Sequence, residues 1–193
     1  EATVKITNLA KATRDAILTE TSPWNKTQTR KRLIVEAGRA SYGYTRVFAG
    51  DIMRATASQP PDITVTLTAK TDAWNKTQFA STSKGPLVQA RSIAQGIADS
   101  LGLAALRWDV ADKQVSNWEH SGALSEQVNA LARLGRWSVF VDDDTLVVAP
   151  LGKPLASVSP AVLDSTSGMV GLPEATEQGV KVRMMFSPNV RCG

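Results

Sequence analysis

Alternating apolar and polar positions dominate the first 80 residues of the chain. The clearest case is ITVTLTA at residues 63–69, where Ile63, Val65 and Leu67 fall on one face of an extended strand. The branched side chains of this stretch also favour strand over helix. Similar but less regular patterns predict further strands over residues 2–7, 32–37 and 45–57.

One helix is predicted between the first two of these strands, over residues 9–18. Its apolar face would consist of four positions at helical spacing: Leu9, Ala12, Ala16 and Ile17. Asn8 stands where an N-cap residue is expected. Gly50 interrupts the longest strand, so we expect a bend or bulge there. Residues 1–80 therefore predict an antiparallel sheet that carries one helix.

Helical spacing takes over after Gly85. Residues 86–101 predict a helix with Pro86 in its first turn and Gly102 just beyond its end. Its apolar positions are Leu87, Ile93, Ile97 and Leu101. Two short strands are expected to follow, over residues 106–110 and 114–118.

A second helix and a hairpin complete this central region. Residues 123–135, ALSEQVNALARLG, predict a helix capped by Ser121 or Ser125, with Gly135 at its end. Its apolar face would comprise Leu124, Val128, Leu131 and Leu134, and we expect it to pack on the strand that follows. Residues 137–149 predict a hairpin with a solvated acidic turn, Asp142, Asp143 and Asp144. This triplet lacks the alternating spacing of a calcium loop.

The sequence suggests three parts. Residues 1–80 form the sheet region, residues 81–150 form an α+β domain, and residues 151–193 form a connector followed by the start of another sheet. In the last part, residues 167–186 predict two antiparallel strands that are joined through residues 171–179, the second strand being 180–186.

The composition excludes several kinds of chemistry. The chain has one cysteine, Cys192, and one histidine, His120, so an intrachain disulfide is impossible and metal sites or triads that need several such residues are disfavoured. We expect His120 to lie on the surface, in a polar connector. The sequence contains no glycine-rich phosphate motif, and no apolar run is long enough to span a membrane. We predict no catalytic residue, no cofactor and no metal.

The net charge of +4 is compatible with nucleic-acid binding, but the basic residues are dispersed among acidic ones. The one compact basic cluster is Arg30, Lys31 and Arg32. We interpret it as the solvated start of a strand rather than as a phosphate contact.

A five-residue word occurs twice. WNKTQ occupies residues 24–28 and again residues 74–78, and both copies lie in predicted connectors at the border of the same sheet. Their flanks differ at once, so they are not units of a repeat protein. Two interpretations stay open: a chance similarity, or subunit-contact loops formed by Trp24, Asn25, Lys26, Thr27, Gln28, Trp74, Asn75, Lys76, Thr77 and Gln78. The other tryptophans, Trp108, Trp118 and Trp137, are expected in the core or half-buried rather than as stacking platforms.

Roughly the last two-thirds of the chain carry a family resemblance. The stretch SGMVGLPEATEQGVKVRMMFSPNVRCG is similar to a segment of the baseplate hub proteins of long-tailed bacteriophages. These proteins are related to the hubs of contractile injection systems. The matching positions are Ser165, Thr166, Gly168, Met169, Val170, Gly171, Pro173, Glu174, Gly179, Val180, Val182, Arg183, Pro188 and Gly193. The helix and hairpin of residues 123–148 also resemble this family.

The resemblance implies an α+β fold in which an incomplete, antiparallel, tail-tube-like β-barrel carries an inserted small α+β domain. It also implies a homotrimeric structural subunit in the virion tail baseplate, assembled in the host cytoplasm. Such a hub adapts the six-fold tail tube to the three-fold spike and contacts other baseplate proteins. DNA passes its lumen without specific binding, and no membrane contact is implied.

The resemblance further suggests that the chain is an excised piece of a longer hub. In that case the strand near Val4 and the strand 180–186 lack partners, and we expect their edges to pair with each other or with further chains.

Two other functions remain as alternatives. A tail-associated cell-wall hydrolase would need a carboxylate that acts as a general acid, and clearing of peptidoglycan would support it. A basic nucleic-acid-binding module would show salt-sensitive binding that depends on Arg30, Lys31 and Arg32.

Overall fold

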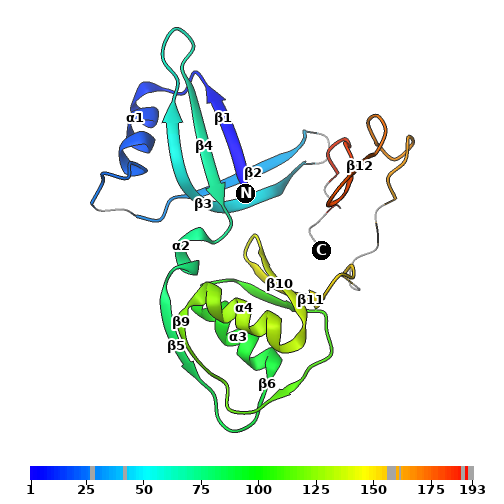
Figure 1. Cartoon of the computed structure of the whole chain (residues 1–193). Coiled ribbons are helices and arrows are strands. Elements are labelled where there is room, and N and C mark those ends of the chain that lie inside the picture. Colours follow the sequence, from blue (N-terminus) through cyan, green and yellow to red (C-terminus); the bar gives the residue numbers. More distant parts are fainter. Residues whose placement is uncertain (27–28, 41–42, 156–159, 161, 188–189, 191–193) are drawn as a thin grey trace.

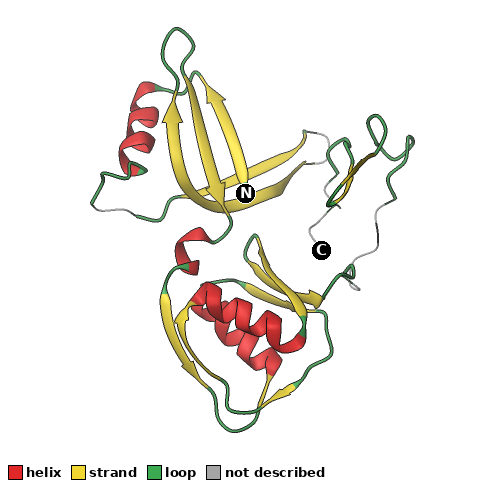
Figure 2. Ribbon diagram, viewed as in Figure 1, coloured by secondary structure: helices red, strands yellow, loops and turns green. Residues whose placement is uncertain are grey.

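A computed structural model describes residues 1–193 except 27–28, 41–42, 156–159, 161, 188–189 and 191–193. The fold is α+β, as predicted, and its largest sheet is a curled antiparallel half-barrel (Figure 2). A second sheet and two helices form a separate layer below it, and a ribbon of two short strands follows at the C-terminal end (Figure 1).

The half-barrel contains four strands in the order β1-β4-β3-β2. These are β1 (Ala2–Thr7), β2 (Arg32–Arg39), β3 (Gly43–Ala57) and β4 (Thr64–Lys70). β4 pairs with β3 only along residues 51–57, so residues 43–50 of β3 pair with β2 alone. The two strands therefore continue as an arm beyond the rest of the sheet (Figure 1).

The two faces of this sheet differ in polarity. Val4 lies opposite Leu67 and Ile6 lies opposite Val65, which places these apolar side chains on one face. The opposite face carries threonines and cations in register, including Thr3 opposite Thr68 and Lys5 opposite Thr66. This is the alternation expected of an antiparallel sheet with one buried face.

Helix α1 (Lys11–Glu20) follows β1 and contacts β3. The predicted N-cap is wrong: the cap residue is Ala10, and Asn8 adopts a left-handed conformation with φ of 58°. The backbone N–H of Asn8 instead donates to the carbonyl of Ile63, so this residue ends β1 rather than starting the helix. None of the helical residues is fully buried, and of the predicted apolar face Ala12 and Ala16 are exposed.

The long strand β3 is irregular near the predicted position. The register shift against β4 lies between Ile52 and Arg54, so the bulge is not at Gly50. Gly50 has a different role, because a Cβ at this residue would lie 2.7 Å from the carbonyl oxygen of Lys70. A residue with a Cβ would therefore collide with the end of β4, and glycine is required at this position.

The central part of the chain wraps around two helices. Its elements are α2 (Ala73–Lys76), β5 (Phe79–Ser83), β6 (Val88–Gln89), α3 (Ala90–Ser100), β7 (Ala105–Trp108), β8 (Gln114–Val115), β9 (Glu119–Ala123), α4 (Leu124–Gly135), β10 (Trp137–Asp142) and β11 (Thr145–Pro150). We call residues 79–150 the module, and residues 71–78, which connect it to β4, the joint.

The module has its own apolar core. Helices α3 and α4 pack together and against the sheet β10-β11-β7, in which β11 is antiparallel to β10 and parallel to β7. Leu146 and Val148 of β11 face the helices, while Val147 and Ala149 face Leu155 of the connector. β11 is therefore buried on both faces, which explains its continuous apolar run.

The tryptophans of the module lie where the sequence placed them, in or beside the core. Trp118 is buried, and Trp108 and Trp137 are half-buried and meet edge to face with their ring centroids 5.0 Å apart. His120 was predicted wrongly as a surface residue in a connector. It is half-buried in β9, where its ring stacks on Trp118, and β9 escaped prediction because EHSGA carries no apolar alternation.

Both helix starts in the module also differ from the prediction. α3 begins at Ala90 because Val88 and Gln89 pair with β8, so Pro86 precedes a strand and not a helix. α4 begins at Leu124 after Ala123 and not after a serine cap. The Glu126 carboxylate accepts a hydrogen bond from the N–H of Ala123 and provides the cap.

The C-terminal ribbon contains β12 (Glu174–Thr176) and β13 (Gly179–Lys181), which pair antiparallel, and a further bridge joins Met169 to Met184. The two predicted antiparallel segments are thus present, although the turn lies at residues 177–178. Large apolar side chains of this ribbon are exposed, among them Val170, Leu172, Val180, Met185 and Phe186.

The buried face of α4 gives the first prediction. Leu131 is fully buried between the helices and the sheet, so Leu131→Ala should lower the free energy of unfolding by about 2–5 kcal/mol through lost contacts and a cavity. Urea denaturation followed by tryptophan fluorescence measures this loss. Asn129→Ala on the exposed face of the same helix is the control, with an expected change below about 0.5 kcal/mol. Equal effects of the two substitutions would show that α4 does not form the core.

Candidate assembly site

The tip of the β10–β11 hairpin contacts the half-barrel. β4 ends at Lys70 opposite Asp51, so the edge of β3 that precedes Asp51 has no β4 residue beside it. The carboxylate of Asp143 accepts a hydrogen bond from the N–H of Ala49 at this edge, with a donor–acceptor distance of 2.9 Å. A side chain of the module thus satisfies a buried backbone donor that the sheet leaves open.

The next residue of the turn adds ionic contacts. Arg46 donates from Nη1 to Oδ2 of Asp144 over 3.1 Å, and Arg32 pairs with the other carboxylate oxygen. We call the contacts of Asp143 and Asp144 with Arg32, Arg46 and Ala49 the clasp. The predicted hairpin turn is confirmed, but its acidic residues are not merely solvated, because the turn is held against the sheet.

A cluster of opposite charges lies beside the clasp, where the joint leaves β4. Arg30 donates from Nε to Oδ1 of Asp51 over 2.8 Å, and its Nη2 lies 3.7 Å from Oδ1 of Asp72. Asp51 and Asp72 are 2% and 3% exposed. One guanidinium thus faces two buried carboxylates, one from β3 and one from the joint.

This environment changes the protonation of Asp72. Burial raises the pKa of its carboxyl from 3.8 to about 6, and the like charge of Asp51 acts in the same direction. The cations Arg30 and Lys76 oppose the rise in this pKa. Desolvation is the larger effect, so Asp72 exchanges its proton close to neutral pH.

The basic cluster of the sequence is neutralised within the chain. Arg30 pairs with Asp51 and Asp72, Lys31 pairs with Glu20 over 2.9 Å, and Arg32 pairs with Asp144. The sequence predicted a solvated start of a strand. In the structure, these side chains are only partly exposed and are paired with carboxylates. They bind carboxylates of the same chain, which leaves them poorly suited to bind phosphates.

The two copies of WNKTQ lie in different environments. In the first copy, Trp24 is 90% exposed in the segment that connects α1 to β2. It lies beside an open hollow of about 490 Å³ that is also lined by Leu18, Thr19, Ser22 and Asn25. Thr27 and Gln28 lie outside the described residues.

The second copy is bonded to the module. The side-chain amide of Asn75 donates a hydrogen bond to the carbonyl of Leu101, the residue that caps the end of α3, over 2.5 Å. The carbonyl of Gln78 accepts from the N–H of Leu124 over 2.9 Å, at the start of α4. The side chain of Lys76 donates to the carbonyl of Thr71 over 3.2 Å. Thr77 is described as well, whereas the side chain of Trp74 is not among the described parts.

The Arg30–Asp72 ion pair joins the borders of the two copies. Arg30 is the second residue after the first copy, and Asp72 is the second residue before the second copy. Both connectors thus meet the same cluster of buried charge. Sequence alone had only indicated that they border one sheet.

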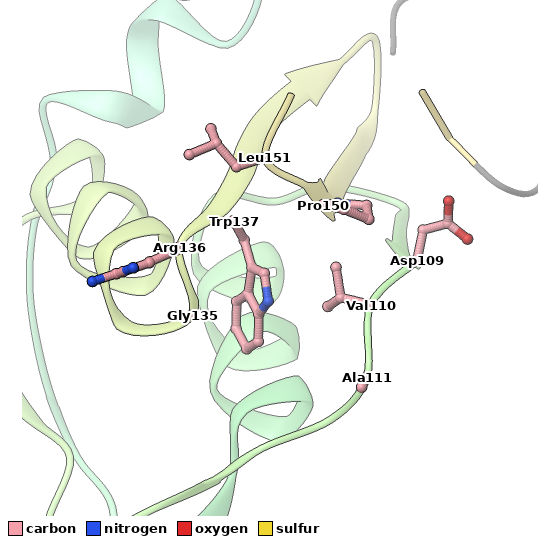
Figure 3. A pocket seen from close by; sticks show the side chains of 8 residues that line it. All are labelled: Asp109, Val110, Ala111, Gly135, Arg136, Trp137, Pro150 and Leu151. Atoms are coloured by element: carbon pink, nitrogen blue, oxygen red, sulfur yellow. The ribbon is translucent and has the colours of Figure 1, made fainter. Parts of the chain in front are cut away.

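A second hollow lies on the module and is drawn in Figure 3. It measures about 550 Å³ and is lined by Asp109, Val110, Ala111, Gly135, Arg136, Trp137, Pro150 and Leu151. The Trp137 ring projects into it between β10 and the segment of Val110, while the Arg136 side chain points away. A Cβ at Gly135 would collide with this ring, so a glycine is needed at the end of α4. Asp109 is the one carboxylate of the lining, whereas a glycosidase needs a pair.

Two further observations concern ligands and membranes. In the described part of the chain, no three metal-ligating side chains gather into a group. No helix among the described residues is long and apolar enough to cross a membrane.

The clasp and the Arg30 cluster are contacts between parts of the same chain, and they offer no arrangement of reactive groups among the described residues. Comparison with protein families gives the particular class: the family model described as baseplate hub gp41 matches residues 1–193. The chain belongs to this family and is a structural, non-catalytic component of a phage tail baseplate. None of the curated proteins compared with the chain matches it.

The clasp supports a prediction that separates its two residues. Asp143→Gly should lower the free energy of unfolding by about 1–3 kcal/mol, because the N–H of Ala49 loses its acceptor in a buried position. Glycine adds no strain at this residue, which has φ of 50°. Asp144→Ala should cost less than about 1 kcal/mol, because its ion pairs are partly exposed. Urea denaturation tests both.

Asp143→Asn is the control for this experiment, since asparagine keeps an acceptor oxygen and tolerates a positive φ. It should retain most of the stability that Asp143→Gly loses. A larger loss for Asp144→Ala than for Asp143→Gly would contradict the assignment of the backbone contact as the stronger one.

The raised pKa of Asp72 predicts a dependence of stability on pH. A group whose pKa is raised by folding stabilises the native state below its unfolded value of 3.8, and this contribution disappears as pH rises through about 6. The loss should amount to about 2–3 kcal/mol in the free energy of unfolding. In Asp72→Asn this decline should be absent, so the variant should gain stability relative to the wild type as pH rises from 4 to 7.

Chemical denaturation at several pH values measures the difference between the two proteins. Asp62→Asn, which changes an exposed loop carboxylate near the same sheet, should follow the wild type. Parallel curves for the wild type and Asp72→Asn would contradict the raised pKa.

Proposed function

We propose that this baseplate hub protein acts as a homotrimeric adaptor that joins the six-fold tail tube to the three-fold spike. The half-barrel, with residues 1–80, would supply a tube-like surface, and residues 81–150 would form an inserted domain. Residues 151–193 would then lead into a second tube-like unit. Other baseplate proteins would bind around it.

The observation that carries the proposal is the pair of open edges of the half-barrel. Among the described strands, β1 pairs only with β4 and β2 pairs only with β3. A curled sheet with two free edges has backbone donors and acceptors available for strands of another chain. If each chain contributes this half-barrel and a second tube-like unit, a trimer would contain six such units. That number would match a six-fold tube.

Exposed apolar side chains support contacts with other subunits. Trp24 is almost fully exposed, Tyr44 and Val47 are exposed on the arm, and the ribbon exposes several more. Tryptophan and tyrosine are the residues that most often dominate the binding energy of an interface. Both copies of WNKTQ stay within this proposal as subunit-contact loops, the first with the stronger case because its tryptophan is exposed.

The face that carries threonines is suited to a channel through which DNA passes without specific binding. Thr68 lies opposite Thr3, Thr66 lies opposite Thr56 and Thr64 lies opposite Thr7, and hydroxyl groups bind water well. The same face also carries Lys5 opposite Thr66 and Arg54 opposite Thr68, so we propose that phosphate contacts there would be few. Weak contact would let the DNA move, whereas many phosphate contacts would retain it.

The proposal predicts a partner-dependent association that uses Trp24. With tail tube and spike proteins present, light scattering should give a mass that contains three copies of this chain. Trp24→Ala should weaken this association by about tenfold or more, as expected for an exposed tryptophan at the centre of an interface. Its free energy of unfolding should change by less than about 0.5 kcal/mol, because the side chain contacts little within the chain.

Leu87→Ala is the matched control, because Leu87 is exposed on the opposite end of the module, near β6. It should leave the association unchanged. A chain that stays monomeric at high concentration with both partners present would overturn the trimeric adaptor. Normal association of Trp24→Ala would instead remove only the contact loop.

A further inference from the structure

The joint combines a covalent connection with a buried ionisable group. Residues 71–78 are the connection between β4 and β5, and Asp72 lies at their start with only 3% of its surface exposed. Asp72 is also held in a left-handed conformation with φ of 48°, which is uncommon for a residue other than glycine. A buried carboxylate in a strained backbone is expected to favour alternatives in which it is released.

We propose that the joint is a proton-controlled hinge between the half-barrel and the module, in which protonation of Asp72 favours the closed arrangement and its ionisation favours opening. Closed means that the clasp is formed and Asp72 is enclosed. Open means that the clasp is released and that Asp72 reaches water. This inference is independent of the proposed adaptor role.

The direction follows from linkage. The arrangement in which a group has the higher pKa is favoured at low pH, because it binds the proton more tightly. Enclosure raises the pKa of Asp72 to about 6, whereas a solvated aspartate has a value of 3.8. The ratio of open to closed molecules should therefore rise by about tenfold between pH 5 and pH 8, and most of the change should lie below pH 7.

The charges around Asp72 come from every segment that meets the joint. Arg30 faces it from the segment before β2, Asp51 from β3 and Lys76 from α2. Arg30 keeps its 2.8 Å hydrogen bond to Asp51 when Asp72 is neutral. Protonation therefore removes a buried charge without leaving the guanidinium unpaired, so the closed arrangement loses little when it takes up the proton.

The clasp gives the hinge a measurable signal. The N–H of Ala49 donates to the Asp143 side chain of the module, so opening should expose this amide to exchange with solvent. Amide hydrogen exchange detects open molecules even when they are rare. The core amides of Leu67 and Leu131 should stay more strongly protected than that of Ala49 at every pH, because opening requires neither the sheet nor the module to unfold.

The experiment measures the protection factor of the Ala49 amide at pH 5, 6, 7 and 8, corrected for the intrinsic exchange rate. In the wild type it should fall by about tenfold over this range. In Asp72→Asn it should be nearly constant and should exceed the wild-type value at each of these pH values, because the neutral side chain corresponds to an Asp72 that is fully protonated. Asp62→Asn should follow the wild type.

Two results would overturn the hinge. One is a protection factor of Ala49 that does not depend on pH in the wild type, or that depends equally in Asp72→Asn. The other is a protection factor of Ala49 that equals those of Leu67 and Leu131 at every pH, which would mean that this amide exchanges only when the whole chain unfolds and not through opening at the joint.

Discussion

The different lengths of β3 and β4 determine how the parts of this protein fit together. β4 ends opposite Asp51 while β3 extends back to Gly43, so part of one strand has no second neighbour. An unpaired buried amide costs about as much as a lost hydrogen bond, and the Asp143 carboxylate supplies the acceptor. The hairpin of the module thus bonds a backbone donor at the open edge of β3 without adding a strand to the sheet. Gly50 permits the close approach of β3 to the carbonyl of Lys70 at the end of β4, next to this contact.

Ion pairs also connect the half-barrel to the joint and to the hairpin of the module. The cations that precede and begin β2 face carboxylates from β3, the joint and the hairpin, so their positive charge is used inside the chain. The formal net charge is a sum over the sequence and does not include this pairing. A basic composition was therefore a poor guide to a nucleic-acid partner, and the arrangement of opposite charges was the informative quantity.

Much of the fold was predictable from periodicity, and the errors have physical causes. The strands of the half-barrel, the two module helices and the hairpin have strong apolar patterns, so their positions were predicted within a few residues. β9 has no such pattern, because its pairing with β5 depends on backbone hydrogen bonds and on α4 beside it. The clasp and the joint were not predictable, since Asp144 meets Arg32 across 112 positions of sequence and each residue alone looks like an ordinary surface charge.

The two copies of WNKTQ also show that local sequence does not determine which contacts a segment makes. The described residues of the two copies have different surroundings, because the first copy lies between α1 and β2 and the second lies between β4 and the module. Asn75 therefore binds the end of α3, whereas Trp24 stays in solvent. A five-residue sequence sets which groups are present, but the topology decides whether they bind within the chain or remain free for other chains. The shared feature is the ion pair of Arg30 and Asp72, which links the loop with the exposed tryptophan to the joint of the module.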